Sequence, residues 1–359
     1  MPKKIFALIF TFSCIIQGYI WSNLQYFDEN MWAYQGEYLL TNNPEAYNSN
    51  YAYGHPGGPI IEGVILIHGL IDSTNQRALH IFLTLFNSLI IASIAFFCYK
   101  LRKKTLWWIV APLCLALNNL YIYGTPPSIV VSLLITLLSL ITIYLYEKEK
   151  LQTKDILLFG IISGLSIATR FDIGGIMTFT FIIILFKKIN YKKLILLCGI
   201  TGITFIIFDP FMWIIPIKHI HDIFQKIFYH YKEFNPTHLT LLQITGISGI
   251  AFLSMIFGLF FIIIKKDIIS PLKKYFLNIL LITTVLLYTL FLTSHYQAER
   301  YFMPMIFIWE TLLPLFIFKI SDKLSNNSNK KEKIINISFI CIILTYQIIL
   351  TYLALIKYK

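Results

Sequence analysis

Long apolar runs separated by short charged segments make up most of the sequence. A helix that crosses a bilayer needs about 20 predominantly apolar residues, and eleven runs are predicted as such helices. They cover approximately residues 5–22, 78–99, 106–123, 128–146, 156–170, 173–186, 194–208, 239–264, 275–293, 301–318 and 334–355. The runs at 156–170 and 173–186 are short, and a re-entrant pair would also fit them. The pattern predicts an all-α polytopic membrane protein, with residues 1–359 forming one domain.

The positions of lysine and arginine predict how this domain is oriented. Basic residues collect on the cytoplasmic side of membrane proteins. With a cytoplasmic N-terminus, the predicted inner segments and the Lys3–Lys4 pair carry 22 of the 30 Lys and Arg residues. The inner segments are residues 100–104, 147–155, 187–193, 265–274 and 319–333. The net charge of +12 is therefore mainly a topology signal, and no nucleic-acid partner is expected. The basic start and first apolar run are interpreted as a retained helix rather than a cleaved signal.

Two predicted outer loops are long, at about 23–77 and 209–238. The first contains IIEGVILIHGL, which is too short to span comfortably and is predicted as an interfacial helix. In the second, apolar residues recur at helical spacing and predict an amphipathic helix at the outer surface. These residues are Ile217, Ile220, Phe224, Ile227, Phe228 and Tyr231.

Arginine is rare, and most of it falls on the predicted outer face. The chain has 26 Lys but four Arg, and Arg77, Arg170 and Arg300 lie outside in this topology. A planar guanidinium grips phosphate in a bidentate manner that an ammonium does not offer. Chance or structural pairing, such as neutralisation of Arg170 by Asp172, explains the positions equally well.

The first outer loop opens with two adjacent acids, Asp28 and Glu29. On a helix, adjacent side chains point about 100° apart, so the two carboxylates would have different roles. One would accept a proton from an attacking group, and its neighbour would orient substrate or hold a cation. Alternatively, the pair marks a solvated loop or caps a following helix.

Five short segments follow one another in an informative order. They are YFDENMW, YGHPGGP, GIISGLSIATRFDIGG, FDPFMW and ERYFMP. Their order and predicted sidedness, over about the first 310 residues, resemble the integral membrane glycosyltransferases of the GT-C superfamily. The nearest match is the protein O-mannosyltransferase and aminoarabinose-transferase-like branch.

This resemblance implies an inverting hexosyl or pentosyl transferase that acts in cell-envelope glycosylation. The donor would be a sugar on a polyisoprenyl phosphate, and the acceptor a protein, lipid or glycan at the extracytoplasmic face. Asp28 would be the catalytic base, assisted by Glu29. The substrate-binding residues implied are His55, Arg170, Arg300 and Tyr301. A phosphate leaving group needs cationic stabilisation more than a general acid.

The chain departs from this family in the next outer loop. Many members carry a second acid there, whereas YIYGTPPS at 121–128 has none. A two-carboxylate metal site is therefore not expected, and the prediction is catalysis without a metal or cofactor. Richness in Ile, Lys and Asn fits an AT-rich genome and hence a bacterial inner membrane.

Other polar residues leave further alternatives. His219 and His221 lie two apart and would not share a helix face, so interfacial polar residues are favoured over a metal site. Glu310 is the one acid within a predicted span, and either pairs across the bundle or contacts substrate. The five cysteines lie in apolar runs and are interpreted as packing residues. A transporter or flippase for a lipid or small solute is the alternative function, and a non-catalytic scaffold is a third.

Overall fold

The computed structural model describes residues 3–23, 57–71, 75–103, 106–118, 121, 125–214, 216–229, 256, 278–280, 282–284, 286, 303–324 and 329–357. Within these ranges every regular element is a helix, and no strand occurs. The elements are α1 (Lys3–Asn23), α4 (Gly58–Ile71), α5 (Asn75–Leu101), α6 (Trp107–Ala116), α7 (Pro126–Glu147), α8 (Thr153–Thr169), α9 (Phe171–Leu185), η2 (Phe186–Lys188), α10 (Tyr191–Ile207), α11 (Phe211–Ile214), α12 (Pro216–Tyr229), α15 (Met303–Leu324) and α16 (Asn329–Lys357).

Three of these helices are long and apolar enough to cross a membrane, at Lys3–Ser22, Gln76–Leu101 and Pro126–Glu147. Shorter apolar helices lie at Gly58–Ile71, Trp107–Ala116, Phe171–Leu185, Met303–Phe318 and Ile334–Ile349. The all-α class with membrane-length helices is thus confirmed for the described chain. The number of eleven crossings stays a prediction, and its spans at 239–264 and 275–293 lie almost wholly outside the described residues.

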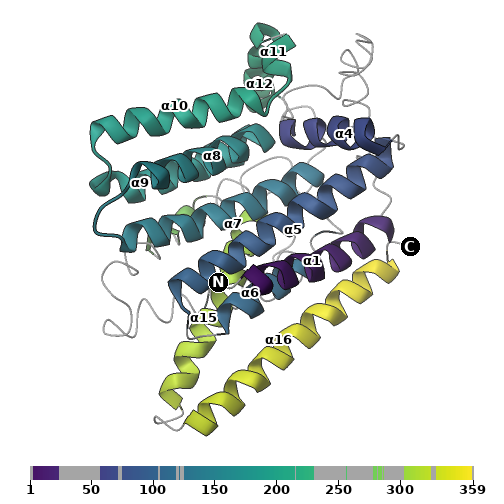
Figure 1. The fold of residues 1–359 in the computed structure, drawn as a ribbon, viewed down its shortest axis with the longest axis vertical. Coiled ribbons are helices and arrows are strands. Elements are labelled where there is room, and N and C mark those ends of the chain that lie inside the picture. Colours follow the sequence, from purple (N-terminus) through teal and green to yellow (C-terminus); the bar gives the residue numbers. More distant parts are fainter. Residues whose placement is uncertain are drawn as a thin grey trace.

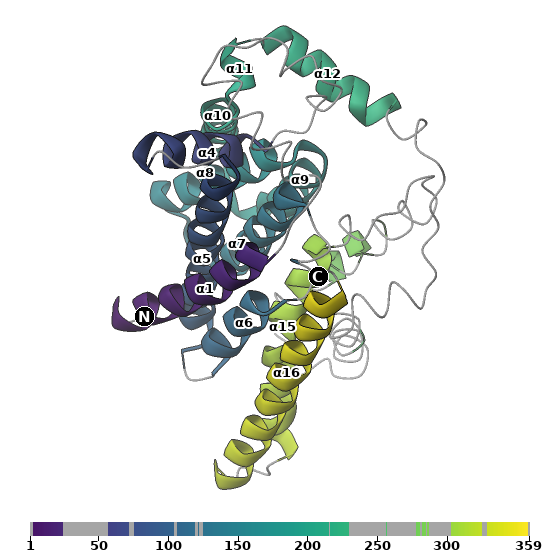
Figure 2. The same ribbon diagram turned by 90° about the vertical axis from the view of Figure 1, so that its right-hand side faces the viewer.

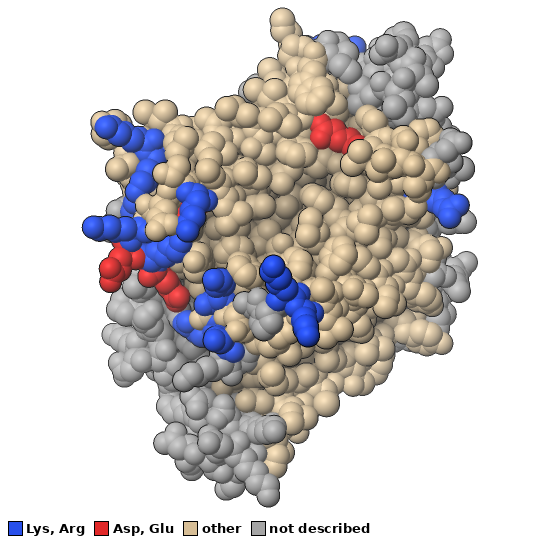
Figure 3. All heavy atoms as spheres, viewed as in Figure 1, with Lys and Arg blue, Asp and Glu red and all other residues tan. Residues whose placement is uncertain are grey.

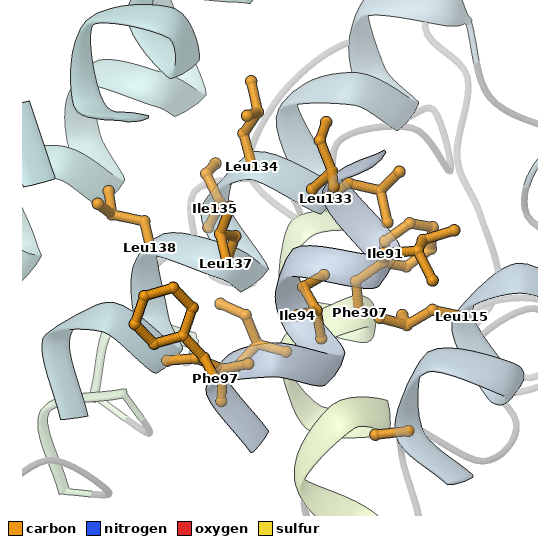
Figure 4. Packing of buried hydrophobic residues seen from close by; sticks show 14 of the residues in the cluster. Ile91, Ile94, Phe97, Leu115, Leu133, Leu134, Ile135, Leu137, Leu138 and Phe307 are labelled. Atoms are coloured by element: carbon orange, nitrogen blue, oxygen red, sulfur yellow. The ribbon is translucent and has the colours of Figure 1, made fainter. Parts of the chain in front are cut away.

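Helix α7 forms the centre of the bundle and is buried along nearly its whole length. It packs against α5, α8, α9 and α15, and α5, α8 and α9 run beside it in Figure 1. Apolar side chains from α5, α6, α7 and α15 meet in one continuous core, part of which is drawn in Figure 4. Figure 2 shows α12 across one edge of the bundle and α15 and α16 along another.

Helices α8 and α9 correspond to the two short predicted spans. They have 17 and 15 residues and are joined through Arg170 alone, which ends one helix and begins the other. Helix α8 packs tightly on α10, because a Cβ at Gly164 would lie 2.7 Å from the carbonyl oxygen of Thr201. The close approach of two apolar helices over small residues is typical of packing within membranes.

Helix α6 is much shorter than predicted. The apolar run indicated a helix over 106–123, whereas α6 ends at Ala116 after 10 residues. The early end is stabilised by distant side chains: Gln17 of α1 donates to the carbonyl oxygen of Ala116 at 3.2 Å, and Gln347 of α16 donates to that of Leu117 at 3.3 Å. These donors replace the hydrogen bonds that a continuing helix would have made.

Basic side chains gather at one end of the bundle. Figure 3 shows Lys and Arg at the left end, where Figure 1 places the α7–α8 and α9–α10 connections. Lys148 pairs with Asp155 at 2.6 Å, and Lys193 donates to the carbonyl oxygen of Leu151 at 2.7 Å. Helix α4 lies toward the opposite end in Figure 1, and the last residue of α8, Thr169, is hydrogen-bonded to Gly57 directly before α4. The basic segments 147–155 and 187–193, which were predicted to lie on the same side of the membrane, thus lie at the same end of the bundle.

Helix α12 is the predicted amphipathic helix. Its apolar residues Ile217 and Ile220 are exposed, by 85% in the case of Ile217, while His219 and Asp222 are buried against the protein. His219 and Asp222 therefore face the protein together with the apolar Ile223, which is 3% exposed, whereas Ile217 and Ile220 face outward.

Candidate functional site

Most residues that the resemblance implies in catalysis lie outside the described part of the chain. This holds for Asp28, Glu29, His55, Arg300 and Tyr301, and their roles stay predictions. Arg170 is the one implied site residue whose surroundings the structure describes. The site is therefore built from Arg170 and from the elements that meet beside it.

Arg170 forms the corner between α8 and α9 in an extended conformation, with φ −159° and ψ 104°. Its Nε and Nη2 donate to the two carboxylate oxygens of Asp172 at 3.0 and 2.9 Å. Its Nη1 donates to Oγ of Ser128 at the start of α7, at 2.7 Å. A bidentate, charge-assisted pair of this kind stabilises a guanidinium that is only 6% exposed. The structure confirms that Asp172 neutralises Arg170.

The end of the YGHPGGP segment is inserted between α8 and α10. Gly57 has φ 76°, a conformation that glycine adopts without steric cost. Its backbone N–H donates to the carbonyl oxygen of Thr169 at 3.1 Å, at the last residue of α8. A Cβ on Gly58 would lie only 1.9 Å from the carbonyl oxygen of Phe208 and 2.9 Å from Cα of Asp209. The two glycines thus let α4 begin directly against the ends of α8 and α10.

Asp209, the first acid after α10, forms a fully buried pair with His219 of α12. Nε2 of His219 lies 2.9 Å from Oδ2 of Asp209, and both side chains are 0% exposed. Because an ionised carboxylate only accepts hydrogen bonds, Nε2 carries the proton of this contact. The ring of Phe211 lies 5.4 Å from the imidazole, centroid to centroid. The pair fixes α12 to the end of α10.

Glu62, in the first part of α4, lies close to this pair. The pKa of Glu62 is raised from 4.5 to about 7, mainly by burial and to a smaller extent by the negative charge of Asp209. Within the described residues, Oε1 of Glu62, Oδ1 of Asp209 and Nδ1 of His219 are buried with no hydrogen-bond partner. A carboxyl group that exchanges its proton near neutral pH suits acid–base chemistry. We call these residues the Glu62–Asp209–His219 cluster.

The predictions made from the sequence for His219 and His221 were only partly correct. His221 is exposed and His219 buried, so the two do not share a face, as predicted. Treating His219 as an interfacial polar residue was wrong, because it is buried against Asp209. In the part of the chain that the structure describes, no group of three His, Cys, Asp or Glu side chains is arranged to hold a metal ion.

Sequence reasoning assigned no role to Glu62, and the Asp209–His219 pair was missed. A usable signal was present in each case. Glu62 is the lone acid in IIEGVILIHGL, and Asp209 directly follows an apolar run and precedes a proline.

Three of the five segments that carry the resemblance therefore meet in space. The end of YGHPGGP contacts the end of GIISGLSIAT and the start of FDPFMW. Of ERYFMP, only Met303 and Pro304 fall within the described residues. Comparison of the chain with protein-family models, curated proteins and solved structures found no match.

Proposed function

We propose that this protein is an integral membrane glycosyltransferase of the GT-C kind. It transfers a hexosyl or pentosyl group from a polyisoprenyl phosphate to a protein, lipid or glycan acceptor. The reaction takes place at the end of the bundle where α4 begins and α8 and α10 end.

The observation that carries this proposal is the contact of Gly57 and Gly58 with Thr169, Phe208 and Asp209. It joins segments that are more than 100 residues apart in the sequence. These segments are three of the five whose order carries the resemblance to the GT-C superfamily. His55 precedes Gly57 by two residues in the sequence.

The distribution of charge supports an active site on the extracytoplasmic side of the membrane. Lys and Arg gather at the end opposite α4 (Figure 3), and such an end is typically cytoplasmic. The active site would then face the extracytoplasmic side of a bacterial inner membrane. A sugar carried on a lipid reaches that side, whereas a cytoplasmic nucleotide sugar does not.

In the proposed reaction, Asp28 accepts the proton of an acceptor hydroxyl or amine. The freed electron pair attacks the anomeric carbon and forms the new glycosidic bond. The bond from that carbon to the phosphate oxygen breaks, and the phosphate leaves with its electron pair, so the configuration inverts. Glu29, His55 and Tyr301 position donor and acceptor. No metal or cofactor takes part.

The phosphate needs cationic stabilisation as its charge develops. Arg300 is the proposed phosphate ligand. Arg170 is already engaged by Asp172 and Ser128, so its main contribution is to hold the corner between α8 and α9. Replacement of Arg300 should therefore reduce sugar transfer, whereas replacement of Arg170 should mainly reduce stability.

The test is transfer from a polyprenyl-phosphate sugar in membranes that contain the wild-type protein or Asp28→Asn. The variant is expected to lose transfer while expression and topology stay unchanged. Glu45→Gln, which removes another acid of the same loop, is the control and should transfer normally. Full transfer by Asp28→Asn would exclude Asp28 as the base. Lipid flipping or solute uptake by proteoliposomes without covalent transfer would instead support a transporter.

A further inference from the structure

Helices α8 and α10 begin side by side at the basic end of the bundle. Nζ of Lys193, in the first turn of α10, donates to the carbonyl oxygen of Leu151, just before α8, at 2.7 Å. Toward their other ends the two helices are still in contact, because a Cβ at Gly164 of α8 would lie 2.5 Å from Cβ of Thr204 of α10. The two helices therefore run in the same direction and start at the same level.

The start of α10 is strongly basic. Residues 187–193 contain four lysines and no acid, and the first turn of α10 has no acidic residue. The start of α8 differs, because Asp155 lies in its first turn and pairs with Lys148 at 2.6 Å. Positive charge at the start of α10 is thus not offset by an acid of its own first turn, and the helix dipole adds to it.

The lysines at this end fall into two groups. Lys188 and Lys193 tie the connections together, since Lys188 donates to the carbonyl oxygen of Lys148 at 2.5 Å and Lys193 to that of Leu151. Lys154 of α8 and Lys192 of α10 instead have exposed side chains. An ammonium carries three N–H donors, so Lys193 can also contact a further acceptor. Figure 3 shows basic side chains gathered at this end.

The two exposed lysines lie on the same side of the α8–α10 pair. Each residue turns a helix by about 100°. Lys154 is therefore about a quarter turn from the side of α8 that contacts α10, and Lys192 about a third of a turn from the side of α10 that contacts α8. The two rotations have opposite senses. For parallel helices, opposite rotations from the mutual contact lead to the same side of the pair.

Exposed apolar side chains follow each lysine along this side. Leu157 and Ile161 follow on α8, and Leu196 and Ile203 follow on α10, all at helical spacing and all exposed. Tyr191, exposed by 70%, lies at the level of the lysines, where aromatic residues of membrane proteins are enriched. We call this surface the α8–α10 face, and it consists of Lys154, Leu157, Ile161, Lys192, Leu196 and Ile203.

Lysines at one end of an apolar face match the shape and charge of an anionic phospholipid. The phosphate of such a lipid lies at the membrane boundary, and its acyl chains extend into the apolar layer. Basic sites between membrane helices on the cytoplasmic side bind anionic head groups. Free phosphate would contact the lysines and leave the apolar residues uncovered. A zwitterionic lipid would cover the apolar residues but brings no net negative charge to the lysines.

We propose that the α8–α10 face binds an anionic phospholipid of the membrane leaflet at the basic end of the bundle, which is the predicted cytoplasmic leaflet. Lys154, Lys192 and Lys193 contact the phosphate, and the acyl chains lie along the exposed apolar residues of α8 and α10. The lipid would hold together the starts of the two helices. This site lies at the end opposite α4 and does not depend on the proposed transfer reaction.

The experiment measures thermal unfolding of the purified full-length protein in mixed micelles. The micelles contain increasing amounts of phosphatidylglycerol or of phosphatidylcholine with the same acyl chains. The wild-type midpoint is expected to rise by several degrees more with phosphatidylglycerol, and to saturate with its concentration. The double variant Lys154→Gln/Lys192→Gln should need about tenfold more phosphatidylglycerol for half of this rise. Lys193 is left in place, because it also contacts Leu151.

Lys100→Gln/Lys103→Gln is the matched control. It removes the same charge from exposed lysines near the end of α5, and should keep the full wild-type response. The same midpoint for the wild-type protein in both lipids would overturn the proposal. An equal loss of response in the two double variants would also overturn it, because the lipid would then be attracted by net charge alone. So would an equal rise on adding inorganic phosphate to phosphatidylcholine micelles, since the ligand would then be the free ion.

Discussion

Nε2 of His219 lies 2.9 Å from Oδ2 of Asp209, with both side chains completely buried. The two residues are ten apart in sequence and belong to different elements, since Asp209 follows α10 and His219 lies in α12. The pair therefore determines where α12 sits at the end of the bundle.

His219→Ala is predicted to lower the free energy of unfolding by about 3 kcal/mol, because it leaves the Asp209 carboxylate buried without its partner. Thermal or denaturant unfolding of the purified protein measures this loss. His221→Ala replaces an exposed histidine of the same helix and should change stability by less than about 0.5 kcal/mol. Equal effects of the two substitutions would show that the buried pair contributes no special stability.

Gly58→Ala is predicted to displace the start of α4. The added Cβ would lie 1.9 Å from a backbone oxygen of Phe208, and backbone does not move aside as a flexible side chain does. The expected loss of stability is about 2 kcal/mol or more. Gly69→Ala is the control in the same helix, because nothing lies within 4 Å of its Cβ. It should be neutral or should stabilise the helix by up to about 1 kcal/mol. Equal stability of the two variants would contradict the tight contact between α4 and α10.

Helices α5 and α7 could be predicted because each is a long apolar run that ends near lysines. Helix α5 was expected over 78–99 and is found at Asn75–Leu101, and α7 was expected over 128–146 and is found at Pro126–Glu147. The early end of α6 could not be predicted in this way. It depends on a hydrogen bond from Gln347, 230 residues away in sequence. The composition of residues 106–123 does not indicate such a distant donor.

The candidate site was predictable to a smaller extent. The order of segments indicated which parts of the chain belong together, and the contact of Gly57 with Thr169 joins two of them. The partner of Asp209 could not be inferred, because it depends on how the chain turns through α11 between the two residues. Pairing of Arg170 with Asp172 was foreseeable, since the two lie two residues apart at a helix start.

Arg170→Lys is predicted to lower the free energy of unfolding by about 2 kcal/mol, because an ammonium cannot contact both oxygens of Asp172 and Ser128 at once. A double-mutant cycle with Asp172→Asn measures the coupling between the two side chains, which should be about 1 kcal/mol or more. Arg102→Lys is the control, since Arg102 is partly exposed and its pairing with Glu147 is looser, at 3.5 Å. Additive effects of Arg170→Lys and Asp172→Asn would contradict a stabilising pair.

Glu62 is predicted to make stability depend on pH. Its pKa is raised from 4.5 to about 7 in the folded protein, so the folded state binds more protons than the unfolded state between these values. Stability from this group is therefore fully present below about pH 4.5 and is lost as the pH rises through about 7. Because solvent partly screens this half-buried residue, the expected loss is about 1–2 kcal/mol rather than the full value of the shift.

Glu62→Gln tests this dependence, because it stays neutral at every pH. The difference in unfolding midpoint between Glu62→Gln and the wild-type protein, followed from about pH 4 to about pH 8, isolates Glu62 from the other titrating groups. The variant should gain stability relative to the wild-type protein as the pH rises. Asp209→Asn removes the neighbouring charge and should move the midpoint of this change to lower pH, because Asp209 contributes to the raised pKa. A difference that does not vary with pH would mean that Glu62 keeps its ordinary pKa and lies in a more hydrated place than the buried Oε1 indicates.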